Sequence, residues 1–153
     1  MLHRPKLLLA NFPSVDRNGH AGHWQGYLSA IQQFDTLAGE TWRRIQADPV
    51  LAGKTTLIIT NDHGRRYDDW TEHGDDSEGS RHIMLVAVGP GIQPGSVSSD
   101  PHSLADLAVS AGHIIGLEPP RGGGRLIAPL VGGMAPRQDV VVNGPLALSA
   151  AGR

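Results

Sequence analysis

Hydrophobic residues of this chain fall into two patterns, short unbroken runs and one long stretch with a helical repeat. The runs occupy residues 6–12, 56–60 and 83–88, are rich in Leu, Ile or Val, and have Gly, Pro or Asp close by. Such runs predict buried β-strands. Residues 24–45 carry apolar side chains every three or four positions, which predicts a long amphipathic helix. A strand, a helix and a strand in this order predict a parallel sheet with a right-handed crossover, and we expect all three runs to lie in this one parallel sheet.

A second helix is predicted in the later part of the chain. Pro101 follows a plausible N-cap, Asp100, and residues 104–115 place apolar side chains on one helical face before Gly116. Proline just inside the start and glycine just past the end are typical of a helix. Residues 118–125 are rich in Pro and Gly and predict a loop.

The end of the chain has a weaker pattern. Residues 126–131 are apolar and predict a short helical turn that packs back on the sheet. No dependable periodicity follows, so residues 134–153 are expected to be partly disordered or to include a late edge strand at 140–142. We therefore expect one α/β domain over residues 1–131 and an irregular tail over 132–153.

Composition narrows the possible partners. The 153 residues carry 13 basic and 15 acidic side chains without a basic stripe, which argues against nucleic acid and anionic membrane. The absence of cysteine excludes disulfides and thiolate metal sites. The apolar run at 7–10 is too short for a signal peptide, and no stretch approaches a membrane span. The location therefore stays open, with the cytoplasm as the default.

Carboxylates and imidazoles follow two of the predicted strands. Asp16 and His20 come after the first run, and Asp62 and His63 come directly after the second, before a glycine that tolerates a sharp turn. Ligands of an open α/β sheet bind outside the carboxyl ends of its strands. Mixed oxygen and nitrogen ligands suit zinc, manganese or iron better than calcium. The two pairs predict two neighbouring divalent ions, an arrangement that serves displacement at phosphorus or sulfur.

A third segment offers another imidazole as a possible metal ligand. The loop between the second and third predicted strands offers His73, and His82 stands at the entrance of the third strand. Both are within the same segment and both have an imidazole to offer. The residues alone leave the choice open.

Taken in order, these pieces resemble the alkaline phosphatase superfamily, particularly its sulfatase-like and nucleotide pyrophosphatase/phosphodiesterase branches. The resemblance covers about residues 5–130. It rests on Asp16-Arg-Asn-Gly-His20 before a long helix with Tyr27 and Asp35, on the run 55–64 ending Asn-Asp-His-Gly, on His-Gly-Asp-Asp at 73–76, on Gly-Pro-Gly at 89–91, and on a closing helix and loop from Ser103 to Leu126.

The resemblance implies a three-layer α/β/α fold with a mainly parallel sheet. It also implies that Asp16 and His20 bind one metal ion with a third histidine, and that Asp62 and His63 bind the other. Zinc and manganese are the expected ions. The substrate is expected to be a phosphate or sulfate ester.

For the third histidine, the resemblance favours His73. It is followed by Gly-Asp-Asp, which is similar to the His-Gly-x-Asp pattern of the family. His82 matches less well and is kept as the alternative metal or substrate ligand.

One part of the family pattern has no counterpart in this sequence. Members carry, upstream of these motifs, a strand with a metal-binding Asp and a Thr, Ser or modified Cys nucleophile. We therefore expect this chain to be the truncated, carboxyl-terminal half of such an enzyme. No catalytic nucleophile is assigned, and the second metal ion has only two ligands here.

Two functions follow, from different classes. The first is metal-dependent hydrolysis of phosphate or sulfate esters, with the isolated chain expected to be nearly inactive. The alternative is a noncatalytic metal-binding remnant, or the partner subunit of a split enzyme. Separately, an open sheet edge is expected, with some tendency to associate through it. A purely structural α/β domain would leave the ordered ligand pairs unexplained.

Overall fold

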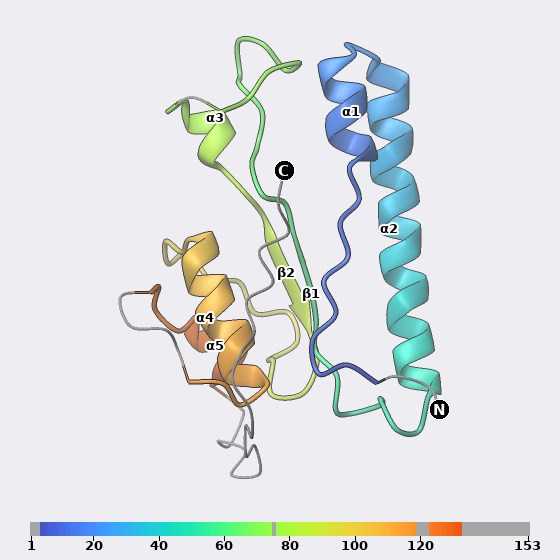
Figure 1. Ribbon diagram of the computed structural model, residues 1–153, viewed down its shortest axis with the longest axis vertical. Coiled ribbons are helices and arrows are strands. Elements are labelled where there is room, and N and C mark those ends of the chain that lie inside the picture. Colours follow the sequence, from blue (N-terminus) through green and yellow to red (C-terminus); the bar gives the residue numbers. More distant parts are fainter. Residues whose placement is uncertain (1–3, 75, 119–122, 133–153) are drawn as a thin grey trace, which may run out of the picture.

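The computed structural model describes residues 4–74, 76–118 and 123–132. Within that part, two helices lie side by side along one side of the molecule, a β-hairpin runs through the middle, and two further helices pack together on the other side (Figure 1). The elements are α1 Ser14–His20, α2 Trp24–Ala47, β1 Leu57–Thr60, α3 Glu78–Arg81, β2 Leu85–Val88, α4 Leu104–Ile114 and α5 Ala128–Val131.

The long helix α2 confirms the prediction made from the helical repeat at 24–45. It begins after His23 and ends where Asp48 donates its backbone N–H to the Arg44 carbonyl. Only Ala30 and Ile45 of this helix are buried. Much of its apolar face is therefore still accessible, including the exposed side chains of Trp24, Leu28, Ile31 and Leu37.

Helix α1 was not predicted, because its residues were interpreted as a loop. Asn18 donates its side-chain amide to the Ser14 carbonyl. Asp16 lies in the first turn, where a carboxylate suits the helix dipole, and His20 lies in the last turn. A helix places residues four positions apart on the same face. This short helix therefore brings Asp16 and His20 together.

The runs at 56–60 and 83–88 do form strands, but the prediction that both are buried is wrong, because β1 is only half-buried and most of β2 is exposed. The two strands pair antiparallel, with Leu57 opposite Val88 and Thr60 opposite Leu85. The prediction that they are parallel neighbours is wrong. A parallel pair needs a crossover long enough to carry the chain back to the starting edge. In the described part of the connection over 61–84 the helix is α3, which at four residues is too short to carry the chain back along the sheet. The chain therefore returns directly and the strands form a wide hairpin.

The run at 6–12 does not form a strand in the structure, contrary to its apolar pattern. Leu7, Leu8 and Leu9 are 58%, 80% and 90% exposed. Phe12 is anchored on α2 through Phe34, with 5.2 Å between the ring centroids. Because a strand needs a neighbour to accept its ladder hydrogen bonds, an apolar run alone does not specify one. The sheet of the described residues has two strands, so a three-layer fold with a mainly parallel sheet stays a prediction.

Helix α4 begins at Leu104, three residues later than Pro101. Its N-cap is Ser103 and not Asp100, because Ser103 and Asp106 form a capping box. The Asp106 carboxylate also accepts the backbone N–H of Arg125. Hydrogen bonds from the backbone N–H groups of Arg125 and Ser103 lower the pKa of Asp106 below its ordinary value.

Helix α5 lies within the helical turn predicted at 126–131, but it packs on α4, whereas the prediction placed it on the sheet. Leu130 of this helix and Ile127 before it are buried, and Ile127 donates its backbone N–H to the Ser110 hydroxyl of α4. The possible strand at 140–142 and almost all of the tail predicted at 132–153 lie outside the described residues. No helix in the described ranges is both long and apolar enough to cross a membrane.

Candidate metal centre

Helix α1 and the loop between β1 and β2 bring three predicted ligands together. The Nε2 atoms of His20 and His73 lie 3.0 Å apart, although the residues are 53 positions apart in the sequence. Asp16 Oδ1 lies 3.5 Å from His20 Nε2 and 3.4 Å from His73 Nε2. The three possible ligand atoms all fall within 4.8 Å of one another. This spacing allows one metal ion to contact all three side chains.

His63 joins the same cluster from the end of β1. Its Nε2 lies 3.8 Å from Asp16 Oδ1, and its ring stacks on that of His73 with 3.7 Å between centroids. Nδ1 of His63 lies 3.0 Å from the Gly64 carbonyl oxygen. This contact favours the tautomer with the proton on Nδ1, which leaves Nε2 free to bind a metal ion.

Asp62 and His82 are placed differently. Asp62 is 85% exposed and lies 3.7 Å from His63 Nε2, at the rim of the cluster. His82 is 67% exposed and contacts the Tyr67 hydroxyl at 3.1 Å and Glu78 at 3.9 Å. Of the two alternatives for the third histidine, the structure therefore brings His73 to Asp16 and His20.

The environment of His73 favours its neutral form. Burial lowers the pKa of His73 below its ordinary value of 6.5, and the nearby His63 lowers it further, while the charge of Asp16 acts in the opposite direction. A neutral imidazole is the form that binds metal ions. His73 is accordingly ready to act as a ligand near neutral pH.

The loop that carries His73 is held against the start of α2 by aromatic side chains. Trp70 meets the edges or faces of Trp24 and Tyr27, with ring centroids 5.0 Å and 5.7 Å away. Trp24 and Tyr27 are in turn stacked on each other. Trp70 is three residues before His73, so this contact limits how far the histidine can move from α1.

Sequence reasoning missed Arg65, which contacts the cluster directly. Its side chain donates to Asp16 Oδ1 at 2.6 Å, to the Asp16 carbonyl at 3.0 Å and to the Thr71 carbonyl at 3.1 Å. The available signal was an arginine immediately after Asp-His-Gly, in a loop otherwise rich in carboxylates and imidazoles. A carboxylate that binds a metal ion commonly has such an outer partner.

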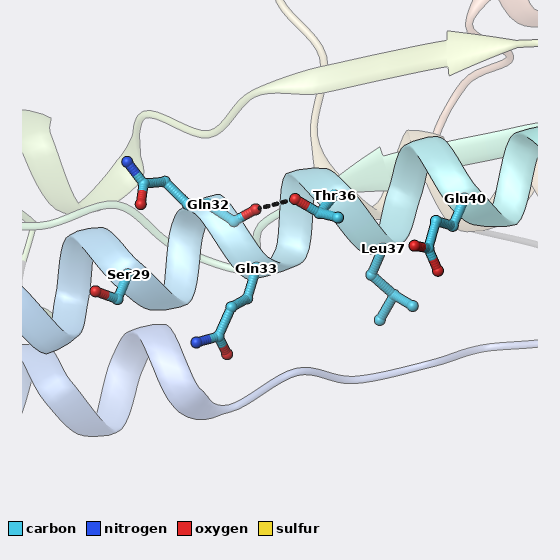
Figure 2. Close-up of a pocket in the computed structure, with 6 residues that line it drawn as sticks. All are labelled: Ser29, Gln32, Gln33, Thr36, Leu37 and Glu40. Carbon is cyan, nitrogen blue, oxygen red and sulfur yellow. Dashed lines mark hydrogen bonds between the residues drawn. The ribbon is translucent and has the colours of Figure 1, made fainter.

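Two hollows on the surface offer no comparable set of ligands. One runs along α2, where polar side chains and one carboxylate project from the helix and Thr36 donates its hydroxyl back to the Gln32 carbonyl (Figure 2). The other lies between Trp42 of α2 and the residues from Ala87 to Ser96, at the carboxyl end of β2. The cluster around Asp16 is therefore the candidate site.

A carboxylate and three imidazoles gathered beside a β-hairpin are typical of enzymes that use divalent metal ions. Residues 2–119 match the family model of the Metalloenzyme superfamily. The chain belongs to this superfamily, whose fold is the alkaline-phosphatase-like α/β fold. Its members are metal-dependent transferases and hydrolases that act on phosphate or sulfate esters. The resemblance inferred from the ordered motifs is thus confirmed.

Individual relatives differ in their reactions. The chain is 31% identical over 114 residues to phosphopentomutase from Carboxydothermus hydrogenoformans and 34% identical over 97 residues to arylsulfatase K from Xenopus laevis. It is 26% identical over 117 residues to a 2,3-bisphosphoglycerate-independent phosphoglycerate mutase from Legionella pneumophila. These matches cover 74%, 62% and 74% of this chain. No solved structure matches the chain.

The chain spans only 27%, 18% and 21% of the length of these three relatives. Two of them are mutases and one is a sulfatase, so the family does not by itself select hydrolysis over transfer. The family implies divalent metal ions, and the carboxylate and imidazole donors of this chain fit such ions.

Proposed function

We propose that this chain binds a divalent metal ion through Asp16, His20 and His73 within a site for phosphate or sulfate esters. The observation that carries the proposal is the approach of these three ligand atoms to within 4.8 Å of one another, from two distant segments. One carboxylate oxygen and two imidazole nitrogens suit zinc or manganese.

A second ion is proposed at Asp62 and His63. His63 Nε2 lies 3.7 Å from Asp62 Oδ1 and 3.8 Å from Asp16 Oδ1, so this nitrogen faces both carboxylates. Two ligands alone seldom fix an ion firmly. The exposure of Asp62 adds to this weakness, and we expect the second site to be weaker than the first.

Divalent ions at such a site would stabilise the charge of the transferring group and activate the attacking oxygen. The residues of the chain prepare the site for them. Burial lowers the pKa of His73 and so favours its neutral form, the Gly64 carbonyl orients His63, and Arg65 holds the Asp16 carboxylate. No residue of the sequence is assigned as the nucleophile, and we propose that this group comes from outside the segment that resembles the family.

Metal content tests the proposal directly. Chain dialysed against zinc or manganese and then desalted is expected to retain the metal, and His20→Ala to retain much less, because it removes one of three ligands. His113→Ala in α4 is the matched control and should behave like the wild type. Metal analysis by mass spectrometry measures the outcome. A wild-type chain that retains almost no metal and shows no change in melting temperature on metal addition would contradict the proposal.

The alternative, a noncatalytic metal-binding chain that completes the site of a partner, is favoured by the weakness of the Asp62 and His63 pair. The isolated chain is therefore expected to turn over nitrophenyl phosphate, phosphodiester and sulfate far more slowly than about 1 per second, the low end of ordinary enzyme rates. Rates are measured with added zinc and manganese. Turnover above that level, abolished by Asp62→Ala, would show that the chain is a complete enzyme.

A further inference from the structure

We infer that Arg65 is a positioning residue, which raises the metal affinity of the site by holding Asp16 and the loop with His73 in fixed positions relative to each other. This inference rests on the proposed metal site. One guanidinium donates to three oxygens on two segments. Two belong to Asp16, at 2.6 Å and 3.0 Å, and the third is the Thr71 carbonyl at 3.1 Å. Arg65 thus connects helix α1 to the loop that carries His73.

The place of Arg65 in the sequence strengthens this role. It lies two residues after His63, and its partner Thr71 lies two residues before His73. All three segments that bear the ligands therefore meet at this one side chain. Only 12% of the Arg65 side chain is exposed, so its hydrogen bonds face little competition from water.

The chain also reserves space for this guanidinium. Gly19 of α1 is buried, and a Cβ atom there would overlap the Nη2 and Cζ atoms of Arg65. Glycine is an unfavourable residue inside a helix, where alanine would be better by about 0.5–1 kcal/mol. The close approach of the arginine gives this costly position a physical reason.

The guanidinium has two effects on the cluster. It donates to Oδ1 of Asp16, the same oxygen that lies closest to the three imidazoles, and so fixes the orientation of the carboxylate. Its charge also offsets one of the two negative charges that Asp16 and Asp62 bring. A lysine in this position retains the charge, but its compact ammonium cannot reproduce the planar fork that reaches both segments.

The test compares zinc affinity in four full-length variants by competition with a coloured chelator. Arg65→Met is expected to weaken zinc binding by about 10- to 100-fold, the usual cost of losing an outer-shell partner of a metal ligand. Arg65→Lys should recover only part of the loss. Gly19→Ala should weaken binding in the same direction, because it displaces the guanidinium without removing it. Arg66→Met, in which the neighbouring arginine loses its contact with Asp68, is the matched control and should bind like the wild type.

A double-mutant cycle separates positioning from a general structural role. Because part of the effect of Arg65 passes through Asp16, Arg65→Met should cost less affinity in a chain that already carries Asp16→Ala than in the wild type. Equal costs in both backgrounds, or wild-type affinity in Arg65→Met and Arg65→Lys, would overturn the inference. Arg65→Lys gives the same comparison should the methionine variant fail to fold. A wild-type chain that binds no zinc would instead reject the proposed metal site itself.

Discussion

His73→Ala is expected to lower the affinity of the chain for zinc by at least about 100-fold, whereas His82→Ala should leave it unchanged. His73 Nε2 lies 3.0 Å from His20 Nε2 and 3.4 Å from Asp16 Oδ1, so its removal takes away a proposed ligand. Loss of an outer-shell partner alone costs about 10- to 100-fold, and loss of a direct ligand should cost more. Titration calorimetry with zinc measures both variants.

His82→Ala is a suitable control because it lies in the same connection between β1 and β2 and removes the same side chain. Its contacts are with Tyr67 and Glu78, on an exposed surface. Circular dichroism of both variants checks that the fold is retained. A large loss of affinity in His82→Ala, with none in His73→Ala, would reverse the assignment of the third ligand.

Gly64→Ala is expected to lower the free energy of unfolding by about 3 kcal/mol, the upper end of the usual cost of overpacking. The backbone N–H of Gly64 donates to the Ser80 carbonyl at 2.8 Å, so the loop after β1 lies directly against α3. A Cβ atom on Gly64 would overlap the Gly79 carbonyl oxygen and lie 2.6 Å from the His82 carbonyl oxygen. Backbone atoms cannot move aside as the end of a flexible side chain can.

Gly39→Ala is the same substitution at a position where the expected change in the free energy of unfolding has the opposite sign. Gly39 lies inside α2, and nothing lies within 4 Å of the position that its Cβ would take. Alanine should therefore raise the free energy of unfolding by about 0.5–1 kcal/mol through its better helix propensity. Urea unfolding of the two variants measures both changes. A Gly64→Ala chain as stable as the wild type would show that α3 does not pack against the loop in solution.

Local patterns in the sequence predicted the long helix well. Its repeat extends over six turns, and a signal of that length is seldom produced by chance. The arrangement of the strands was harder to predict, because the apolar runs at 56–60 and 83–88 indicate strands but specify neither their direction nor their burial, and most of β2 is exposed. The direction of the second strand depends on whether the connection contains a helix long enough to carry the chain back along the sheet. The apolar pattern did not show that the helix in this connection, α3, has only four residues.

The candidate site was predicted to a similar degree. Asp16, His20, His63 and His73 come together in the structure. The first three were candidates because they follow predicted strands, and His73 was favoured by the resemblance to the family. Asp16 and His20 come together for a different reason than predicted. Their spacing of four residues places them on one face of helix α1, whereas the prediction relied on the end of a strand. Arg65 could not be predicted in the same way, because hydrogen bonds to carbonyl oxygens leave no pattern in the sequence.

The separation of the ligands along the chain has a consequence for folding. A metal ion held by His20 and His73 would act as a cross-link between points 53 residues apart. In the chain-entropy description of cross-links, closing a loop of that size lowers the entropy of the unfolded chain by an amount worth about 4 kcal/mol at room temperature. The buried hydrophobic residues of the described part are few, namely Ala30, Ile45, Val109, Ile127 and Leu130. The rise in melting temperature on adding zinc would therefore report the cross-link between α1 and the loop with His73 as well as the occupancy of the site. A chelator that removes the zinc would remove the cross-link too.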